Sequence, residues 1–100
     1  MTKKLTKSEI QDRLQKLTGW NIENNKITKE MLFPDFATAF GFMSSIAIVA
    51  DSMNHHPEWF NVHNKVKIWL TTHEADGVSE NDINLARKID AFWETKRTSG

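Results

Sequence analysis

Asp35-Phe-Ala-Thr-Ala-Phe-Gly-Phe-Met-Ser-Ser-Ile-Ala-Ile-Val-Ala-Asp-Ser-Met-Asn-His-His-Pro57 is the segment from which the architecture is most readily inferred. Asp35 is suited to be a helix N-cap, and apolar side chains at helical spacing follow it as far as Met53. His56 precedes Pro57, and a residue before proline is disfavoured in a helix. The segment therefore predicts one long helix, about Phe36 to Met53, that ends near Asn54 or His55.

This helix is apolar over most of its circumference. One stripe consists of Phe36, Phe40, Met43, Ala47 and Ala50, a second consists of Phe42, Ile46, Val49 and Met53, and Ile48 widens the apolar surface. A helix with one apolar stripe lies on a surface, whereas a helix with two is buried on more than one side. A sheet in so small a domain covers one side, so we expect a second subunit to cover the other. The alternative is a helix that is central in the monomer.

The residues before this helix predict a shorter helix and a hairpin. Thr6 and Glu9 match a capping box, and Gly19 is the expected C-terminal stop of the first helix. Residues 20–33 then form two alternating stretches around Asn24-Asn25, a pattern typical of a β-hairpin.

The residues after the long helix predict a second hairpin, over residues 58–63 and 66–72, around Asn64-Lys65. Alternation along the two strands predicts one face with Phe60, Val62, Val66, Ile68 and Leu70, and another with Trp59, Asn61, His63, Lys67, Trp69, Thr71 and His73. Residues 74–78 form a loop, and Ser79 caps a last helix with Asp82 at the capping-box position. The order predicts one α+β domain over residues 1–100, with its helices on one sheet face.

Composition narrows the classes of function. Thirteen basic residues balance thirteen acidic ones, which argues against direct nucleic-acid binding, and there is no cysteine for a disulfide or a thiolate nucleophile. No segment approaches the roughly 20 apolar residues of a membrane span, and Met1 to Lys7 is polar and basic, unlike a secretory signal. We therefore expect a cytoplasmic protein with no membrane contact.

All four histidines fall between His55 and His73. Imidazole titrates near neutral pH, so this concentration indicates proton transfer or metal binding more than packing. Asp51 lies one helical turn before His55 and can hold that ring, which is the arrangement that acid–base catalysis requires. His73, at the end of a strand, could face the pair across a cleft.

Structural interpretations of the same residues stay open. A histidine at a helix C-terminus is often only a cap, His63 fits a polar position on the wet face of a strand, and Asp82 is explained by its helix cap. Trp59 fits either a core position or a stacking surface for a flat ligand. Three histidines and an acid also match zinc, although the chain has no His-Glu-x-x-His helix and no cysteine pair.

The same segment resembles the signature of the pterin-4a-carbinolamine dehydratases. That signature is an acidic residue, three positions, His-His-Pro, an aromatic residue, a later histidine and an aspartate, which correspond here to Asp51, His55-His56-Pro57, His73 and Asp82. The likeness runs from about Trp20 to Ile89. His63 departs from it, because the family usually carries tyrosine or another aromatic there, and we expect a changed pocket rim or packing.

The resemblance implies a fold, an assembly and a reaction. The fold is a four-stranded antiparallel sheet with three helices on one face, and the assembly is a homodimer or homotetramer built by sheet edges and helices. The reaction removes water from a 4a-hydroxytetrahydropterin to give the quinonoid dihydropterin, with no metal and no cofactor. It would recycle the cofactor of aromatic amino acid hydroxylases, which are therefore candidate partners.

The resemblance also implies roles for individual residues. His55 would be the leading acid–base residue with Asp51 as its orienter, and His56 and His73 would bind the pterin and share proton transfer. The predicted pocket residues around them are Pro57, which aims the pair, Trp59, Thr71, Thr72 and Glu74, with Asp82 supporting His73 or the loop. A second hypothesis is a protein-binding module, because some animal members act as dimerisation cofactors of a homeodomain transcription factor. The intact histidine set favours the enzyme.

Overall fold

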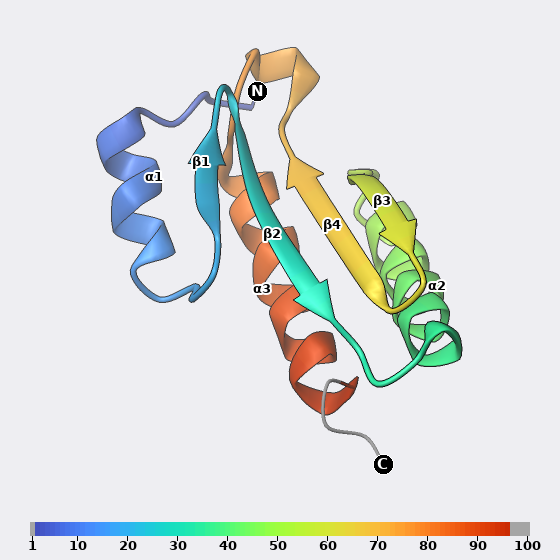
Figure 1. The fold of residues 1–100 in the computed structure, drawn as a ribbon. Helices are drawn as coiled ribbons and strands as arrows, with labels where there is room; N and C mark the ends of the chain where they lie inside the picture. The colour runs from blue at the N-terminus through green and yellow to red at the C-terminus, as the bar shows by residue number, and fades with distance from the viewer. Residues whose placement is uncertain (1, 97–100) are drawn as a thin grey trace.

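The computed structural model describes residues 2–96 and contains a helix, a hairpin, a helix, a hairpin and a helix in that order (Figure 1). The helices are α1 (Lys7–Leu14), α2 (Phe36–Ser52) and α3 (Glu80–Lys96). The strands are β1 (Asn21–Glu23), β2 (Lys26–Leu32), β3 (Glu58–Val62) and β4 (Lys65–Leu70), and a 3₁₀-helix, η1 (His73–Ala75), follows β4. The predicted α+β fold with the order α-β-β-α-β-β-α is confirmed.

The four strands form one antiparallel sheet in the order β1-β2-β4-β3. Helices α2 and α3 lie behind this sheet in Figure 1, and α1 lies beside β1. The fully buried side chains between sheet and helices are Ile27, Met31, Val66, Ile68, Leu70, Phe42, Ile46, Ile83, Leu85 and Ile89. None of the helices within residues 2–96 is long and apolar enough to cross a membrane.

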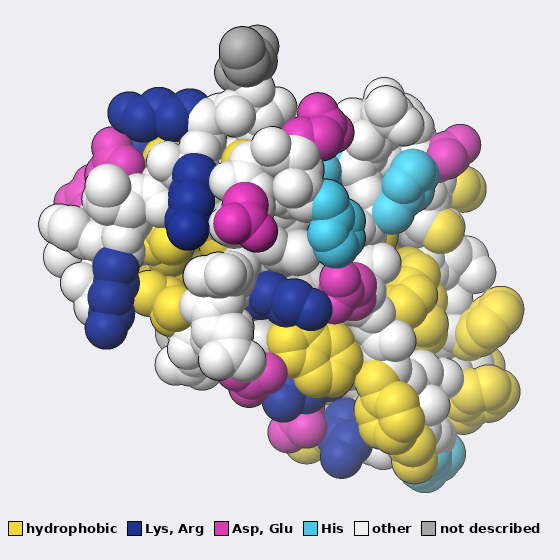
Figure 2. Space-filling model, turned by 90° about the horizontal axis from the view of Figure 1, so that it is seen from above, with side chains coloured by type: hydrophobic (Ala, Val, Ile, Leu, Met, Phe, Trp, Pro, Cys, Tyr) yellow, Lys and Arg dark blue, Asp and Glu magenta, His cyan; other side chains and the backbone are white. Residues whose placement is uncertain are grey.

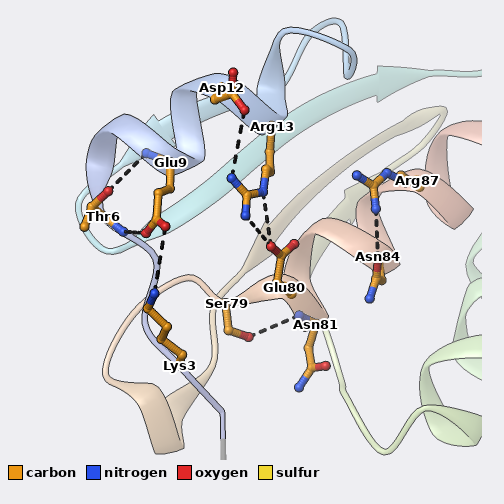
Figure 3. Close-up of polar contacts among 10 residues, drawn as sticks. All are labelled: Lys3, Thr6, Glu9, Asp12, Arg13, Ser79, Glu80, Asn81, Asn84 and Arg87. Atoms are coloured by element: carbon orange, nitrogen blue, oxygen red, sulfur yellow. Dashed lines mark hydrogen bonds and ion pairs between the residues drawn. The ribbon is translucent and has the colours of Figure 1, made fainter.

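Helix α1 begins as the capping box predicts. Thr6 Oγ1 accepts a hydrogen bond from the Glu9 amide at 3.1 Å, and Glu9 Oε1 accepts one from the Thr6 amide at 2.8 Å (Figure 3). The predicted end at Gly19 is wrong, because the helix ends at Leu14. Tight turns with i→i−3 bonds follow it and carry Leu17 into the core, and Gly19, with φ of 92°, turns the chain into β1.

A side-chain contact joins α1 to the start of α3. The Arg13 guanidinium donates two hydrogen bonds to Glu80 Oε2, through Nε at 3.1 Å and through its terminal nitrogen at 2.5 Å (Figure 3). The same contact raises the pKa of Arg13. This contact attaches α1 to the start of α3.

Helix α2 is capped at both ends by its own sequence. Asp35 accepts a hydrogen bond from the Thr38 amide at 2.7 Å, as predicted, and the pKa of its carboxyl lies below the ordinary value because of hydrogen bonding to Thr38. At the other end Asn54 adopts a left-handed conformation with φ of 52°. The His55 amide then bonds to Ala50 O and the Asn54 amide to Asp51 O, which is a Schellman motif. The reversal at Asn54 sets the direction in which the two histidines leave the helix.

The apolar surface of α2 is buried on one side and exposed on the other. The buried positions are Ala39, Phe42, Ile46 and Ala50, whereas Phe36, Phe40 and Ile48 are 51%, 57% and 73% exposed. A single chain thus covers one side of the helix, as the sequence predicts. Coverage of the other side by a second subunit stays a prediction.

The predicted side-chain faces of β3 are wrong. Val62 pairs with Lys65 and Trp59 pairs with Ile68, so the turn is His63-Asn64, one residue earlier than predicted. Directly paired residues of antiparallel strands lie on one face, so Trp59 and Asn61 share the face of Val66 and Ile68. The prediction assigned them to the opposite face because it continued the alternation across the turn with the wrong parity. Trp59 therefore lies on the helix side of the sheet, and Phe60 and Val62 lie half-exposed on the outer face.

His63 is a turn residue in a left-handed conformation, with φ of 52°, and not a strand residue as predicted. It lies at the end of β3 opposite to Glu58 and Pro57. Within this chain it does not border the histidine cluster, so the expected change of a pocket rim is not supported by its position.

Candidate active site

Four elements end or begin at the top of the molecule in Figure 1: the C-terminus of α2, the start of β3, the segment from β4 to η1, and the start of α3. Figure 2 looks onto this end of the molecule and shows histidine and acidic side chains close to one another. The structure thus gathers His55, His56, His73 and Asp82, which the sequence predicts as site residues, at one end of the fold.

His55 is held by Asp82. His55 is buried, and its Nε2 lies 2.5 Å from Oδ1 of the fully buried Asp82. Asp82 Oδ2 accepts hydrogen bonds from Thr72 Oγ1 at 2.8 Å and from the Ser79 amide at 2.9 Å. The predicted cap of α3 is confirmed, but the carboxylate supports His55 as well as the loop, and it does not contact His73.

Asp51 contacts His56, and the predicted pairing with His55 is wrong. Asp51 Oδ1 lies 3.2 Å from His56 Nε2, and both side chains are exposed. The prediction placed His55 one helical turn after Asp51, whereas α2 ends at Ser52. The turn at Asn54 directs His55 inward and leaves His56 on the surface beside the last turn of the helix.

His73 faces Glu58, a residue that the sequence interpretation missed. His73 Nε2 lies 3.8 Å from Glu58 Oε2, and Glu58 Oε1 accepts a hydrogen bond from Lys26 Nζ at 2.6 Å. The side chain of His73 is 86% exposed. The sequence placed Glu58 at the start of a strand, but nothing in the sequence indicated that Lys26 and His73 would lie beside it.

The other predicted residues divide into supports and surface groups. Thr71 Oγ1 donates to Asn25 O at 2.9 Å, and Thr72 is buried against Asp82, so both anchor the segment that carries His73. Glu74 is exposed in η1.

Two open depressions flank Trp59. The first has a volume of about 500 Å³ and is lined by Ala47, Ile48, Ala50, Asp51, His56, Pro57 and Trp59. The second, of about 290 Å³, is lined by Glu23, Asn24, Lys26, Glu58, Trp59 and Trp69. Trp59 lines both depressions and Pro57 lines the first, while Trp59 belongs to the face of the sheet opposite to the predicted one.

The three imidazoles share one arrangement: Nε2 of each ring faces a carboxylate. The pairs are His55 with Asp82, His56 with Asp51, and His73 with Glu58. For His55 and His56 the separation is that of a hydrogen bond, which favours the hydrogen on Nε2 when the ring is neutral and leaves Nδ1 as the acceptor. His73 and Glu58, at 3.8 Å, form an ion pair when the ring is protonated. Within residues 2–96, no group of three or more histidine, aspartate or glutamate side chains is arranged to hold a metal ion.

These features define a small antiparallel α+β domain with histidine–carboxylate pairs where four of its elements meet. Residues 3–92 match the family described as Pterin 4 alpha carbinolamine dehydratase, and the chain belongs to that family. The resemblance inferred from the sequence is thereby confirmed.

Individual relatives agree with the family. A protein of Solibacter usitatus, named "Putative pterin-4-alpha-carbinolamine dehydratase", is 52% identical over 92 residues, which are 92% of this chain and 97% of the relative. A protein of the same name from Burkholderia multivorans is 50% identical over 93 residues, 91% of each chain. A crystal structure from Brucella melitensis, described as "transcriptional coactivator/pterin dehydratase", superimposes with a TM-score of 0.88 at 46% identity, covering 90% of this chain and 98% of that one.

Proposed function

We propose that this chain removes water from a 4a-hydroxytetrahydropterin by histidine acid–base catalysis, in a step that recycles the cofactor of aromatic amino acid hydroxylases. The observation that supports the proposal most directly is the set of three imidazoles, each with Nε2 against a carboxylate, in a member of the pterin dehydratase family. Such a set supplies proton donors and acceptors that operate near neutral pH.

The reaction needs two proton transfers. The bond between C4a and the hydroxyl oxygen breaks, and the leaving hydroxide takes a proton to become water. The hydrogen on N5 is removed as a base takes its proton, and the electron pair of the N–H bond forms the C4a=N5 double bond of the quinonoid dihydropterin. One acid and one base that are both active near pH 7 account for every atom in this conversion.

The three pairs suggest how the work is divided. His55, held by the buried Asp82, is the leading acid–base residue, because its ring has one orientation and its carboxylate balances the charge of the protonated ring. His56 and His73 are exposed and bind the pterin while sharing proton transfer. Trp59 and Pro57, which line the depression beside His56, form a wall against which a flat ring can lie.

The test is turnover of a 4a-hydroxytetrahydropterin by purified protein. We expect His55→Ala and His73→Ala each to lower kcat by about 10²-fold or more, in the range that positioned acids and bases contribute. His63→Asn is the matched control, because it removes a histidine from the far end of β3 and places a residue that tolerates its left-handed backbone. Activity of both alanine variants equal to that of the wild type would refute the mechanism, and no activity of the wild type would refute the function.

A second candidate function is assembly with a protein partner. The observation that favours it is the exposed apolar stripe of α2, formed by Phe36, Phe40 and Ile48, together with the words "transcriptional coactivator" in the description of the Brucella melitensis structure. A large exposed apolar patch marks an interaction surface. We propose that a second copy of this chain occupies it in a homodimer or homotetramer, and that a transcription factor is the alternative occupant.

A further inference from the structure

We propose that Glu58, anchored by Lys26, is the positioning residue that orients the His73 imidazole for proton transfer. The inference rests on the proposed dehydratase function and concerns a carboxylate to which neither the sequence interpretation nor the resemblance gives a role. It assigns the third histidine–carboxylate pair of the site, in addition to those of His55 and His56.

The backbone that carries His73 is firmly held. Thr71 Oγ1 donates to Asn25 O at 2.9 Å, and Thr72 Oγ1 donates to Asp82 at 2.8 Å. The Thr72 amide also bonds to Gly77 O at 2.8 Å, which closes the loop around η1. These contacts fix where the Cα of His73 lies, but they do not fix the direction of its ring.

The ring of His73 projects from this rigid base with 86% of its side chain exposed. Within residues 2–96, Glu58 is its only charged partner, at 3.8 Å from Nε2. An imidazole this exposed otherwise distributes over several rotamers, and proton transfer requires one of them. The Glu58 carboxylate is therefore the group that selects the orientation.

Lys26 keeps Glu58 in place for this task. Its Nζ donates to Oε1 at 2.6 Å, which is a short charge-assisted hydrogen bond, while Oε2 is the oxygen that faces His73. Lys26 is the first residue of β2 and Glu58 is the first residue of β3, and these two strands flank β4 in the sheet. Because one carboxylate oxygen is engaged by the lysine, the other stays directed at the histidine.

The distinguishing experiment is a double-mutant cycle between Glu58 and His73, measured with a 4a-hydroxytetrahydropterin. We expect Glu58→Ala to lower kcat by about tenfold with KM within about twofold, which is a part of the 10²–10⁴-fold that a positioned acid or base supplies. In the His73→Ala background the same substitution should change kcat by less than about twofold, because Glu58 acts through the ring that is already missing. If Glu58 had only a structural role, Glu58→Ala would lower kcat in that background as well.

Two further variants test the role of Lys26 and provide a control for the loss of a surface glutamate. Lys26→Met should lower kcat by a smaller factor, about threefold, and should have no effect once Glu58 is alanine. Glu30→Ala is the matched control, because Glu30 is another exposed sheet glutamate with a lysine partner, Lys65, at 3.7 Å. Exposed ion pairs contribute little to stability, so we expect Glu58→Ala to leave the unfolding temperature nearly unchanged.

A measurement without substrate keeps the inference independent of the reaction. Three-bond couplings across χ1 of His73 should report one rotamer in the wild type and averaging in Glu58→Ala, with no change in Glu30→Ala. Averaged couplings in the wild type, or equal loss of kcat from Glu58→Ala with and without His73, would overturn the assignment. An active wild type with a fully active Glu58→Ala variant would overturn it while leaving the dehydratase function intact.

Discussion

Asp82 uses its two carboxylate oxygens for two different purposes. Oδ2 accepts from the Ser79 amide and Thr72 Oγ1, which fixes the start of α3, and Oδ1 faces His55 Nε2. A helix cap engages a single oxygen, so the second is free to hold the catalytic candidate without loosening the helix. Asp82 therefore occupies both the capping-box position of α3 and the aspartate position of the family signature. The two roles are compatible because they use different carboxylate oxygens.

Asp82→Asn should therefore affect both activity and stability. We expect kcat to fall by about 10-fold or more, because an amide does not balance the charge of a protonated His55, and the free energy of unfolding to fall by about 1–3 kcal/mol, because a buried network loses a charged acceptor. Asp51→Asn is the contrasting variant. Its side chain is 85% exposed beside His56, so urea denaturation should give nearly wild-type stability. Equal loss of stability in both variants would contradict the two pairings.

His63 offers a test of backbone strain away from the site. Its φ of 52° is tolerated by asparagine but costly for a β-branched residue. We expect His63→Val to lower the free energy of unfolding by about 1–2 kcal/mol and His63→Asn to change it little. Both should keep the kcat of the wild type, because the turn lies at the far end of β3 from Glu58. Chemical denaturation and the dehydration assay measure the two effects separately.

The elements themselves were largely predictable, because their ends have local signals. Thr6, Asp35 and Ser79 cap the helices where their side chains indicate, and the first hairpin turns at Asn24-Asn25. The register of β3 was not predictable, because Asn64 can occupy either position of a two-residue turn. Asn61 helps to settle it, since its amide donates to His63 O at 3.1 Å and to Lys65 O at 2.8 Å. That contact spans the turn and does not appear in hydrophobic alternation.

The capping box of α1 should make stability depend on pH. The pKa of Glu9 lies below its ordinary value, chiefly because its carboxylate accepts the Thr6 amide hydrogen bond. A depressed folded-state pKa gives stability that is complete above the ordinary value and lost as the pH falls through the lower, folded value. The difference in unfolding temperature between wild type and Glu9→Gln should thus be largest near neutral pH and vanish in acid. If the difference in unfolding temperature grew as the pH was lowered, the proposed contribution of the capping box to stability would be contradicted.

For the molecule as a whole, the site was predictable as a set of residues but not as a set of pairs. Sequence spacing relates residues on one element, and it placed Asp51 close to the histidine pair. Asp82 was added to the predicted site by the resemblance, and His63 lies away from the cluster. The pairs His55–Asp82 and His73–Glu58 each join residues of different elements, at separations that only the folded chain brings together. The family signature names most of the residues involved, but it does not state which carboxylate faces which ring.

The site also adjoins the apolar flank of the molecule. Figure 2 shows hydrophobic side chains on the side where Figure 1 places α2 and β3, next to the histidine-bearing end. The exposed large apolar side chains are Leu32, Phe36, Phe40, Ile48, Phe60 and Val62. Ile48 belongs to this surface and also lines the depression that contains His56 and Trp59. A second copy seated on α2 would therefore border the open side of the site.

This adjacency predicts that assembly and substrate binding are coupled. Phe40→Glu places a charge in the middle of the exposed stripe of α2, so we expect sedimentation velocity to show a monomer where the wild type is a dimer or tetramer. The monomer keeps its histidine–carboxylate pairs, so KM should rise several-fold while kcat falls less. Asn84→Glu, an equal change of charge on the exposed side of α3, is the control and should leave both quantities unchanged. A monomeric wild type would contradict the predicted assembly. A monomeric Phe40→Glu variant with unchanged KM would show that the site of each chain is complete without its neighbour.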